Sequence, residues 1–465
     1  MKADSQYSNL LDQRRPPWAV IIALAWPTIA EQLLQVMVTF VDSAMVGSLG
    51  ASATASVSVP TSTIWLVNGW MNAFAIGYGV LMARSLGGGQ RERARTIVYQ
   101  SLITALPFAL LLTTLFVWVA TVLPSWIATD SLVIAQAEEY YHWIAIGYLP
   151  NLVMILISSH LRLSGDTKTP LLYNGLNNIL NITFNTLFIF DGVRVGPITV
   201  PGLGLGVKGA AMATTLACTI TALLLLSIML RGEGAITLRG YRISGWQRSI
   251  QRSALRLAIP VALERTTLSL GQILYTKLIG TLGTTALAAH FLATTAESIT
   301  YLPSSGFSTA ATTLVAHSLG SGNKALAKRF GDTSLTVGTL FMSGMGLVLY
   351  LFASPILSLF TADGAVIALG TKVLRIEAFA QPAFGLSMLA FGVFRGAGDT
   401  KSPFFISIAG MWLLRLPLAW ALLSYTTLGL LGIWIAMAGD IMLRGIICLF
   451  SYRRYGWLDR YREQH

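Results

Sequence analysis

The chain has 465 residues, of which 54% are hydrophobic and only 11% are charged. Soluble domains carry roughly 25% charged residues, so this composition excludes an ordinary water-soluble protein. Lysine and arginine outnumber aspartate and glutamate by 32 to 20, which gives a net charge of +12. The basic residues are spread over many short loops rather than gathered on one face, and this spread argues against nucleic-acid binding.

Apolar runs of about 20 residues recur along the chain, and each is long enough to cross a bilayer as a helix. Twelve helices are predicted in chain order, over residues 18–46, 55–84, 97–123, 136–160, 170–190, 206–230, 254–280, 286–316, 330–358, 368–394, 403–424 and 428–451. No short alternating strands are expected between them. The predicted fold class is therefore an all-α polytopic membrane protein, and the polar first fourteen residues indicate no cleavable signal peptide.

Loop charges predict how the helices are oriented. Basic residues mark the second loop, the eighth loop, both tails and above all the stretch between the sixth and seventh helices. The intervening loops 47–55, 281–286 and 425–430 carry no lysine or arginine. By the positive-inside rule, both termini and the central linker are predicted to lie in the cytoplasm.

The two halves of the chain repeat each other at a shift of 233 residues. "PTIAE" from Pro27 matches "PVALE" from Pro260, and "RLSGDTKTP" from Arg162 matches "RGAGDTKSP" from Arg395. "SLGGG" and "SLGSG" likewise occupy matching positions after the second and eighth helices. Six helices per half give two repeats of the same orientation, which is typical of a transporter with its substrate cavity between two bundles.

This repeat predicts two pseudo-symmetric six-helix lobes joined by a linker. The expected domains are a cytoplasmic tail (1–17), an N-lobe (18–230), a cytoplasmic linker (231–253), a C-lobe (254–452) and a second cytoplasmic tail (453–465).

Two polar stripes run along otherwise apolar helices of the first half. The residues that share one face of the first helix are Glu31, Gln35, Thr39 and Asp42. Those on one face of the fifth helix are Asn174, Asn178, Asn181 and Asn185. Because polar groups facing lipid are costly, the stripes are expected to face each other or a wet cavity. Their oxygens suit a proton or a small cation such as Na⁺, although the asparagines alone are equally consistent with hydrogen bonds between helices.

Asp42 is the strongest candidate for a coupling group. No basic residue on its own helix neutralises it, and a carboxylate in a low-dielectric site takes up and releases a proton as its surroundings change. Pro27 removes a backbone hydrogen bond and marks a place where the first helix can bend. The sequence therefore predicts a titrating stripe on a hinged helix.

The second half keeps only part of this pattern. Glu264 matches Glu31, but Tyr275 stands at the position of Asp42. Glu264 and Glu297 either line the cavity and attract a cationic substrate, or pair with Arg265 and Lys277 for structural reasons. The residues assigned to the cavity are Glu264, Gln35, Asn178 and Glu297.

Three charged residues near the end of the chain form a separate group. They are Arg415, Asp440 and Arg444. They are expected to form an internal ion pair or to snorkel towards the membrane surface, and this structural role is favoured.

The combined motifs resemble the multidrug and toxic compound extrusion family. They are "P…VD…VG.LG" in the first helix, "R-x-x-G-D-T-K-[ST]-P" once in each half, and "NITFN" and "GVKGAAMAT" in the fifth and sixth helices. The resemblance covers about residues 18–452. It implies a secondary exporter in the inner membrane that expels organic cations and drugs by alternating access, driven by H⁺ or Na⁺ entry, without enzymatic activity or a cofactor.

The same resemblance implies a cation site built from three helices. The matching positions here are Asp42, Asn181, Asn185 and Thr214, to which Glu31 is added from the polar stripe. Some family members have an aspartate at the position of Asn185, so the choice between H⁺ and Na⁺ stays open. Some carry an acidic residue on the tenth helix where this chain has Phe384, so a second cation site there is not expected.

Two alternative functions remain. A flippase for lipid-linked oligosaccharides has a related two-lobe plan, but it would need a strongly basic cavity to hold a pyrophosphate. A membrane-embedded enzyme or receptor would need a catalytic set or a ligand domain, and the sequence shows neither. The expected partners are small-molecule substrates and membrane lipid, with the chain acting as a monomer.

Overall fold

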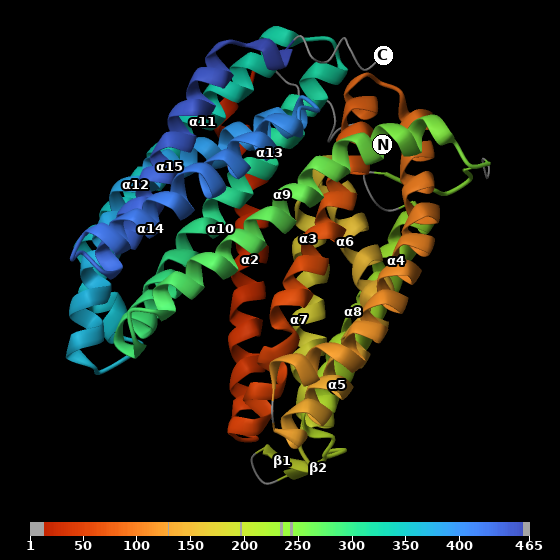
Figure 1. Cartoon of the computed structure of the whole chain (residues 1–465). Helices are drawn as coiled ribbons and strands as arrows, with labels where there is room; N and C mark the ends of the chain where they lie inside the picture. Colours follow the sequence, from red (N-terminus) through yellow and green to blue (C-terminus); the bar gives the residue numbers. More distant parts are fainter. Residues whose placement is uncertain (1–13, 129, 196–197, 233–235, 242–244, 459–465) are drawn as a thin grey trace. The chain divides into compact units, whose positions relative to one another are not determined.

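The computed structural model of the chain describes residues 14–128, 130–195, 198–232, 236–241 and 245–458, and Figure 1 traces their course. Most of the predicted tails and parts of the predicted linker lie outside the described residues.

All twelve predicted segments are helical, and most of them extend several residues beyond their predicted ends. The first half contains α2 (Pro17–Gly47), α3 (Ala51–Gly87), α4 (Arg91–Ile127), α5 (Ser131–Ile146), α6 (Tyr148–Leu163), α7 (Lys168–Ile189) and α8 (Gly206–Arg231). The second half contains α9 (Arg248–Gly280), α10 (Thr284–Gly320), α11 (Lys324–Ser358), α12 (Gly364–Gly396), α13 (Lys401–Ile408), η1 (Ala409–Arg415), α14 (Leu416–Tyr425), α15 (Leu430–Arg453) and the short η2 (Gly456–Leu458). The fold is a polytopic bundle of twelve helical segments, six in each half of the chain.

Eight of these segments are long and apolar enough to cross a membrane, and the bent pair α5–α6 makes a ninth. Within the described ranges, α7, α9 and α10 are not among them. These three helices carry the asparagine stripe and the glutamates at positions 264 and 297. Part of the candidate functional residues therefore lies on the helices that are least suited to lipid, while Asp42 and Thr214 lie on α2 and α8, which are suited to it.

The fourth segment is bent by 47° between α5 and α6. Pro150 lies in the first turn of α6 and has no backbone N–H to donate to the carbonyl of Ile146. Gly147 occupies the break, where an added Cβ would lie 2.7 Å from the hydroxyl oxygen of Thr215 on α8. The break therefore lets this segment pack closely against α8.

The eleventh segment is also irregular, because a π-helical stretch, η1, separates α13 from α14. Pro417 follows this stretch and cannot donate to the carbonyl of Leu413. π-helical turns are frequent at functional sites. Here the turn ends at Arg415, which belongs to the ion-pair group described below.

One small element departs from the predicted all-helical pattern. A hairpin of β1 (Gly192–Val195) and β2 (Ile198–Pro201) connects α7 to α8, with Val193 paired to Val200. The expectation of no strands is wrong for this loop. The strands are only four residues long and lie between two apolar helices, so their alternation is too short to stand out.

Contacts divide the described chain into two compact units. Unit 1 comprises Ala30–Met82 and Gln90–Leu255. Unit 2 comprises residues 14–29, Ala83–Gly89 and residues 256–458. The start of α2 and the last turn of α3 therefore group with the second half of the chain, and Pro27 lies just before the point where α2 changes unit.

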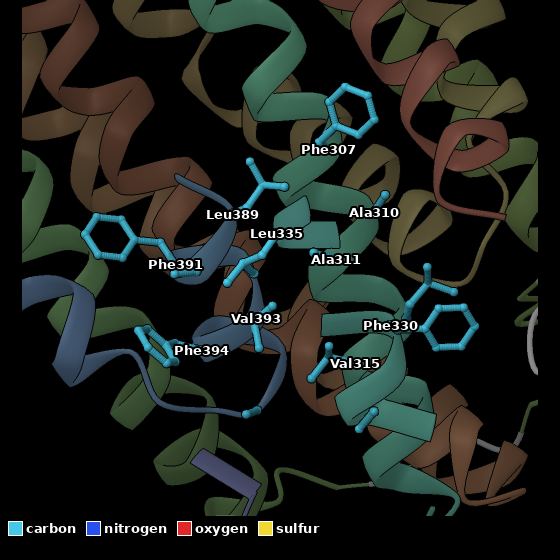
Figure 2. Close-up of a cluster of buried hydrophobic side chains, with 14 of the residues drawn as sticks. Phe307, Ala310, Ala311, Val315, Phe330, Leu335, Leu389, Phe391, Val393 and Phe394 are labelled. Carbon is cyan, nitrogen blue, oxygen red and sulfur yellow. The ribbon is translucent and has the colours of Figure 1, made fainter. Parts of the chain in front are cut away.

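An extensive apolar core lies in unit 2. Figure 2 shows side chains from three helices in this core, namely Phe307, Ala310, Ala311 and Val315 of α10, Phe330 and Leu335 of α11, and Leu389, Phe391, Val393 and Phe394 of α12. Val20, Ile21 and Leu24 from the start of α2 join the same cluster. This packing explains why the start of α2 groups with unit 2.

Small residues and hydroxyl groups hold α10 against α12. Ser308 donates to the carbonyl oxygen of Met388 at 2.8 Å, and Thr312 donates to that of Gly392 at 2.8 Å. A Cβ on Gly392 would lie 2.5 Å from the Ser308 carbonyl oxygen. Helices in membranes associate through such close packing and interhelical hydrogen bonds, because lipid supplies no hydrophobic drive between them.

The repeat is reproduced in local geometry as well as in sequence. Asp130 caps α5 by accepting from the backbone N–H of Leu132 at 2.8 Å. Asp363, at the matching position, caps α12 by accepting from the N–H of Ala365 at 2.8 Å. The matching motifs therefore form the same turns in both halves.

Candidate functional site

A chain of hydrogen bonds in unit 1 joins the four residues that were assigned to the cation site. The Asn185 amide donates to the Asp42 carboxylate at 2.6 Å and to the Asn181 carbonyl oxygen at 3.2 Å. The Asn181 amide in turn donates to the Thr214 hydroxyl at 3.0 Å. These residues come from α2, α7 and α8, and they are called the Asp42 group below.

The Asp42 group offers oxygen atoms that suit a small hard cation. Asn185 and Asn181 are almost fully buried, and within the described ranges the Asn185 side-chain oxygen has no hydrogen-bond partner. One carboxylate, two amide oxygens and one hydroxyl are donors of the kind that Na⁺ accepts. A half-turn of the Asn185 amide would point its free oxygen towards Asp42, so the group fits either a protonated carboxyl or a bound Na⁺.

Tyr140 of α5 adjoins the Asp42 group, and the sequence did not single it out. It packs against a small cluster that includes Val46 and Ile189. Val46 and Ile189 lie about one helical turn from Asp42 and Asn185, so this packing places Tyr140 beside the Asp42 group. An aromatic residue in a membrane helix gives no distinctive sequence signal, so only the fold reveals its place.

Glu31 lies apart from the Asp42 group. Arg162, from the end of α6, donates to its two carboxylate oxygens at 2.7 and 3.0 Å. Asn174 of α7 donates to the same carboxylate at 2.9 Å. The charge of Glu31 is therefore compensated within unit 1, as expected for a structural clamp.

The polar stripes thus serve two different centres. Asn174 belongs with Glu31, while Asn181 and Asn185 belong with Asp42. Asn178 lies buried between them on α7, and its amide nitrogen has no hydrogen-bond partner in the part of the chain that the structure describes. Gln35 is exposed on α2.

Glu264 makes the matching clamp in unit 2. Arg395 donates to its two carboxylate oxygens at 3.3 and 3.1 Å, and Ser407 donates to it at 3.2 Å. The sequence spacing of this pair equals that of Glu31 and Arg162, 131 residues in each case. The expected structural alternative paired Glu264 with Arg265, and that partner is wrong, because the partner is the repeated motif arginine.

Unit 2 also contains a buried acidic cluster, which consists of Glu297 and Glu377 with Tyr301 and Gln381. The hydroxyl of Tyr301 donates to Glu297 at 2.5 Å, and the two glutamates are close enough for their charges to interact. Neither carboxylate oxygen of Glu377 and no side-chain polar atom of Gln381 has a hydrogen-bond partner among the described residues. Such groups are costly to bury and mark a candidate proton or cation site.

Glu377 was not predicted as a site residue, and whether a second cation site exists on the tenth helix stays an open expectation. Phe384 indeed lies at this cluster, with its ring centroid 4.6 Å from that of Tyr301. Glu377 lies two turns earlier on the same face of α12 and supplies the carboxylate that Phe384 lacks. An acidic residue inside a predicted membrane helix was the signal that could have found it.

The internal ion-pair group near the end of the chain is confirmed. Arg415 of η1 donates to Asp440 of α15 at 2.8 Å, and Arg444 also contacts the same carboxylate oxygen. Asp440 is fully buried. The two arginines and one aspartate leave an excess positive charge within this group.

Comparison with known proteins identifies the family. The chain matches MatE over residues 27–187 and 260–421. The protein belongs to the MatE family. The two matched segments begin at Pro27 and Pro260, so they coincide with the internal repeat.

Relatives of similar length support this assignment. The chain is 30% identical to the probable multidrug resistance protein NorM of Thermotoga maritima, over 98% of this chain and 97% of that protein. It is 27% identical to the multidrug resistance protein MdtK of Yersinia pseudotuberculosis, over 95% of each. An uncharacterized transporter of Bacillus subtilis, YisQ, is 23% identical over 95% of each chain.

Solved structures show the same fold. A MATE crystal structure in complex with MaL6 superimposes with a TM-score of 0.88 at 22% identity, over 97% of this chain and 98% of the other. The outward-facing conformation of a multidrug resistance MATE family transporter gives 0.87 at 23% identity, with the same coverage. The predicted resemblance is confirmed, and the protein is a multi-pass transporter of the plasma membrane rather than an enzyme.

Proposed function

We propose that this protein exports organic cations or drugs across the plasma membrane in exchange for H⁺ or Na⁺. Relatives over nearly the full length, NorM and MdtK, are named as multidrug resistance proteins. The observation that carries the exchange mechanism is the contact of Asp42 with Asn185, which continues through Asn181 to Thr214. A flippase for lipid-linked oligosaccharides is less well supported, since the Asp42 group offers carboxylate and amide groups rather than a basic pocket.

The Asp42 group can couple ion binding to a movement of α2. With Asp42 charged, its carboxylate accepts from the Asn185 amide; with a proton on the carboxyl, Asp42 becomes a donor and favours the Asn185 oxygen instead. When Asp42 changes from accepting a hydrogen bond from the Asn185 amide nitrogen to donating one to the Asn185 oxygen, the contact between α2 and α7 changes. Pro27 interrupts the hydrogen bonds of α2 close to its change of unit, and there a bend costs least.

Separately imposed gradients test the function and identify the ion. Purified protein in proteoliposomes should accumulate or expel a cationic dye when either a pH gradient or a Na⁺ gradient is applied, and one of the two should suffice. Transport that proceeds only with ATP, or an absence of uphill movement with either gradient, would contradict the proposal.

We further propose that both termini and the linker are cytoplasmic, on the basis of the loop charges. In a background with Cys218 and Cys448 replaced by alanine, Ser48→Cys and Thr281→Cys should react with a membrane-impermeant maleimide in intact cells. Gln90→Cys and Gly245→Cys should react only after permeabilisation, because their loops lie on the predicted inner side. Labelling of Gly245→Cys from outside would reverse the assignment.

The Glu297–Glu377 cluster is a second candidate coupling centre, favoured by the nearly complete burial of both glutamates. If the Asp42 group is the main site of ion coupling, Glu377→Gln should slow uphill export by less than about tenfold, because the amide keeps the shape of the side chain. Dye transport driven by the effective gradient measures this change. A loss as complete as that of Asp42→Asn would assign the coupling to both centres.

A further inference from the structure

A groove on the surface of unit 2 opens where α12 lies between α11 and α15. It has a volume of about 560 Å³, and its lining includes Tyr350, Lys372, Arg375, Phe379, Ile435 and Met442. Gly439 also lines it, and a Cβ at that residue would meet no atom within 4 Å, so the side chains leave open space there.

Two cations stand on one side of this groove. Lys372 and Arg375 are both exposed and lie one turn apart on α12, so their side chains are neighbours. Arg375 donates its Nε to the backbone carbonyl oxygen of Tyr350 at 3.3 Å and lies over the Tyr350 ring, 5.3 Å from its centroid. Among the described residues, no carboxylate forms an ion pair with either cation.

The remaining wall of the groove is apolar and faces outward. Phe379 is 65% exposed, Ile435 is 41% exposed and Met442 is 37% exposed. In a protein that spans the membrane, such side chains contact lipid. Neither aspartate nor glutamate lines the groove, so a cationic drug would be repelled by its two positive charges.

The depth of the two cations suits a lipid headgroup. A helix of 33 residues such as α12 is about 50 Å long, roughly 20 Å more than the hydrocarbon core, and a helix centred in the bilayer extends about 10 Å beyond the core at each end. Lys372 and Arg375 lie about 12 and 17 Å from the start of α12. Their long side chains therefore reach the boundary between the hydrocarbon and the headgroups.

We propose that this groove binds an anionic phospholipid, with its phosphate between Lys372 and Arg375. An acyl chain then lies along Phe379, Ile435 and Met442. Arginine and lysine donate charge-assisted hydrogen bonds to phosphate oxygens, and the surrounding apolar medium strengthens them. The predicted topology assigns this lipid to the outer leaflet, and the site neither uses nor requires the Asp42 group.

Native mass spectrometry of the purified protein with added phosphatidylglycerol or phosphatidylcholine tests this site. The wild type should retain one phosphatidylglycerol more than Lys372→Gln/Arg375→Gln, and should bind it about tenfold more tightly than the double variant. Phosphatidylcholine should show no such difference, because its choline offsets the charge of its phosphate. Phosphatidylglycerol should also raise the melting temperature of the wild type more than that of the double variant, since a ligand stabilises the state it binds.

Lys208→Gln is the matched control, because it removes one cation whose ammonium already lies 3.5 Å from Glu139. It should retain phosphatidylglycerol like the wild type. Lys372→Arg should also retain it, since a guanidinium keeps the charge. Equal retention by the wild type and the correctly folded double variant, or an equal loss in Lys208→Gln, would overturn the proposal.

Discussion

Asp42→Asn is expected to reduce uphill drug export by about 100-fold or more, which corresponds to the loss of the coupling between ion and drug. Asparagine has nearly the same shape, and its side-chain oxygen can still accept from the Asn185 amide. The variant should therefore insert, fold and bind drug. It can neither take up a proton nor supply the negative charge that holds Na⁺. Gradient-driven dye transport in proteoliposomes measures the effect.

Asp130→Asn is the matched control for this substitution. Asp130 caps α5 through its side-chain oxygen, and asparagine is an equally good N-cap residue. The same chemical change should therefore leave transport within about twofold of the wild type. If Asp42→Asn exported drug uphill at the wild-type rate, Asp42 would not be the coupling group, and the Glu297–Glu377 cluster would be the next candidate.

Glu264→Gln is expected to destabilise the folded protein by about 3–5 kcal/mol, because it leaves the buried charge of Arg395 without its partner. Removal of both charges in Glu264→Gln/Arg395→Gln should cost less than the single change, since no unpaired charge remains. Thermal unfolding in detergent ranks the stability of the wild type, the single variant and the double variant. Glu139→Gln serves as the control, because Glu139 is 57% exposed and its pair with Lys208 should contribute little.

The same variant separates the two roles that the sequence left open for Glu264. If the carboxylate acts as a clamp, the folded fraction of Glu264→Gln should transport cationic and neutral drugs with equal losses. A selective loss for cationic drugs would instead show that Glu264 contacts substrate. Because Glu31 makes the same clamp with Arg162, Glu31→Gln should behave in parallel.

Much of the fold was predictable, since membrane helices are specified by long apolar runs. All twelve segments appear, and the repeat of 233 residues indicated that the halves share their turns, as the caps at Asp130 and Asp363 do. The bend at Gly147 was not predicted. Pro150 removes a backbone hydrogen bond from the helix, but a proline within an apolar run does not by itself determine whether the helix bends. The hairpin β1–β2 was not predicted, because its strands of four residues are too short to show a clear alternating pattern in the sequence.

The composition of the Asp42 group could be predicted because its polar residues stand out on apolar helices. The helical periodicity placed Glu31 and Asp42 on one face of the first helix. Their partners nevertheless differ, because Glu31 contacts Arg162 and Asp42 contacts Asn185. The spacing of polar residues along one helix does not predict which residues of other helices pack against them. Glu264 and Arg395 lie 131 residues apart, and only tertiary packing brings them together. Glu377 was not predicted, because the resemblance to the family points only to the position of Phe384 on this helix.

Simultaneous recording of ion and drug flux tests most directly whether the Asp42 group carries the coupling ion. Proteoliposomes loaded with a cationic drug would report drug efflux together with internal pH or Na⁺ concentration. The wild type should move ions inward in a fixed ratio to the drug that leaves. Asp42→Asn should exchange drug for drug across the membrane without any accompanying ion movement. Ion entry in Asp42→Asn at the wild-type ratio would contradict the account.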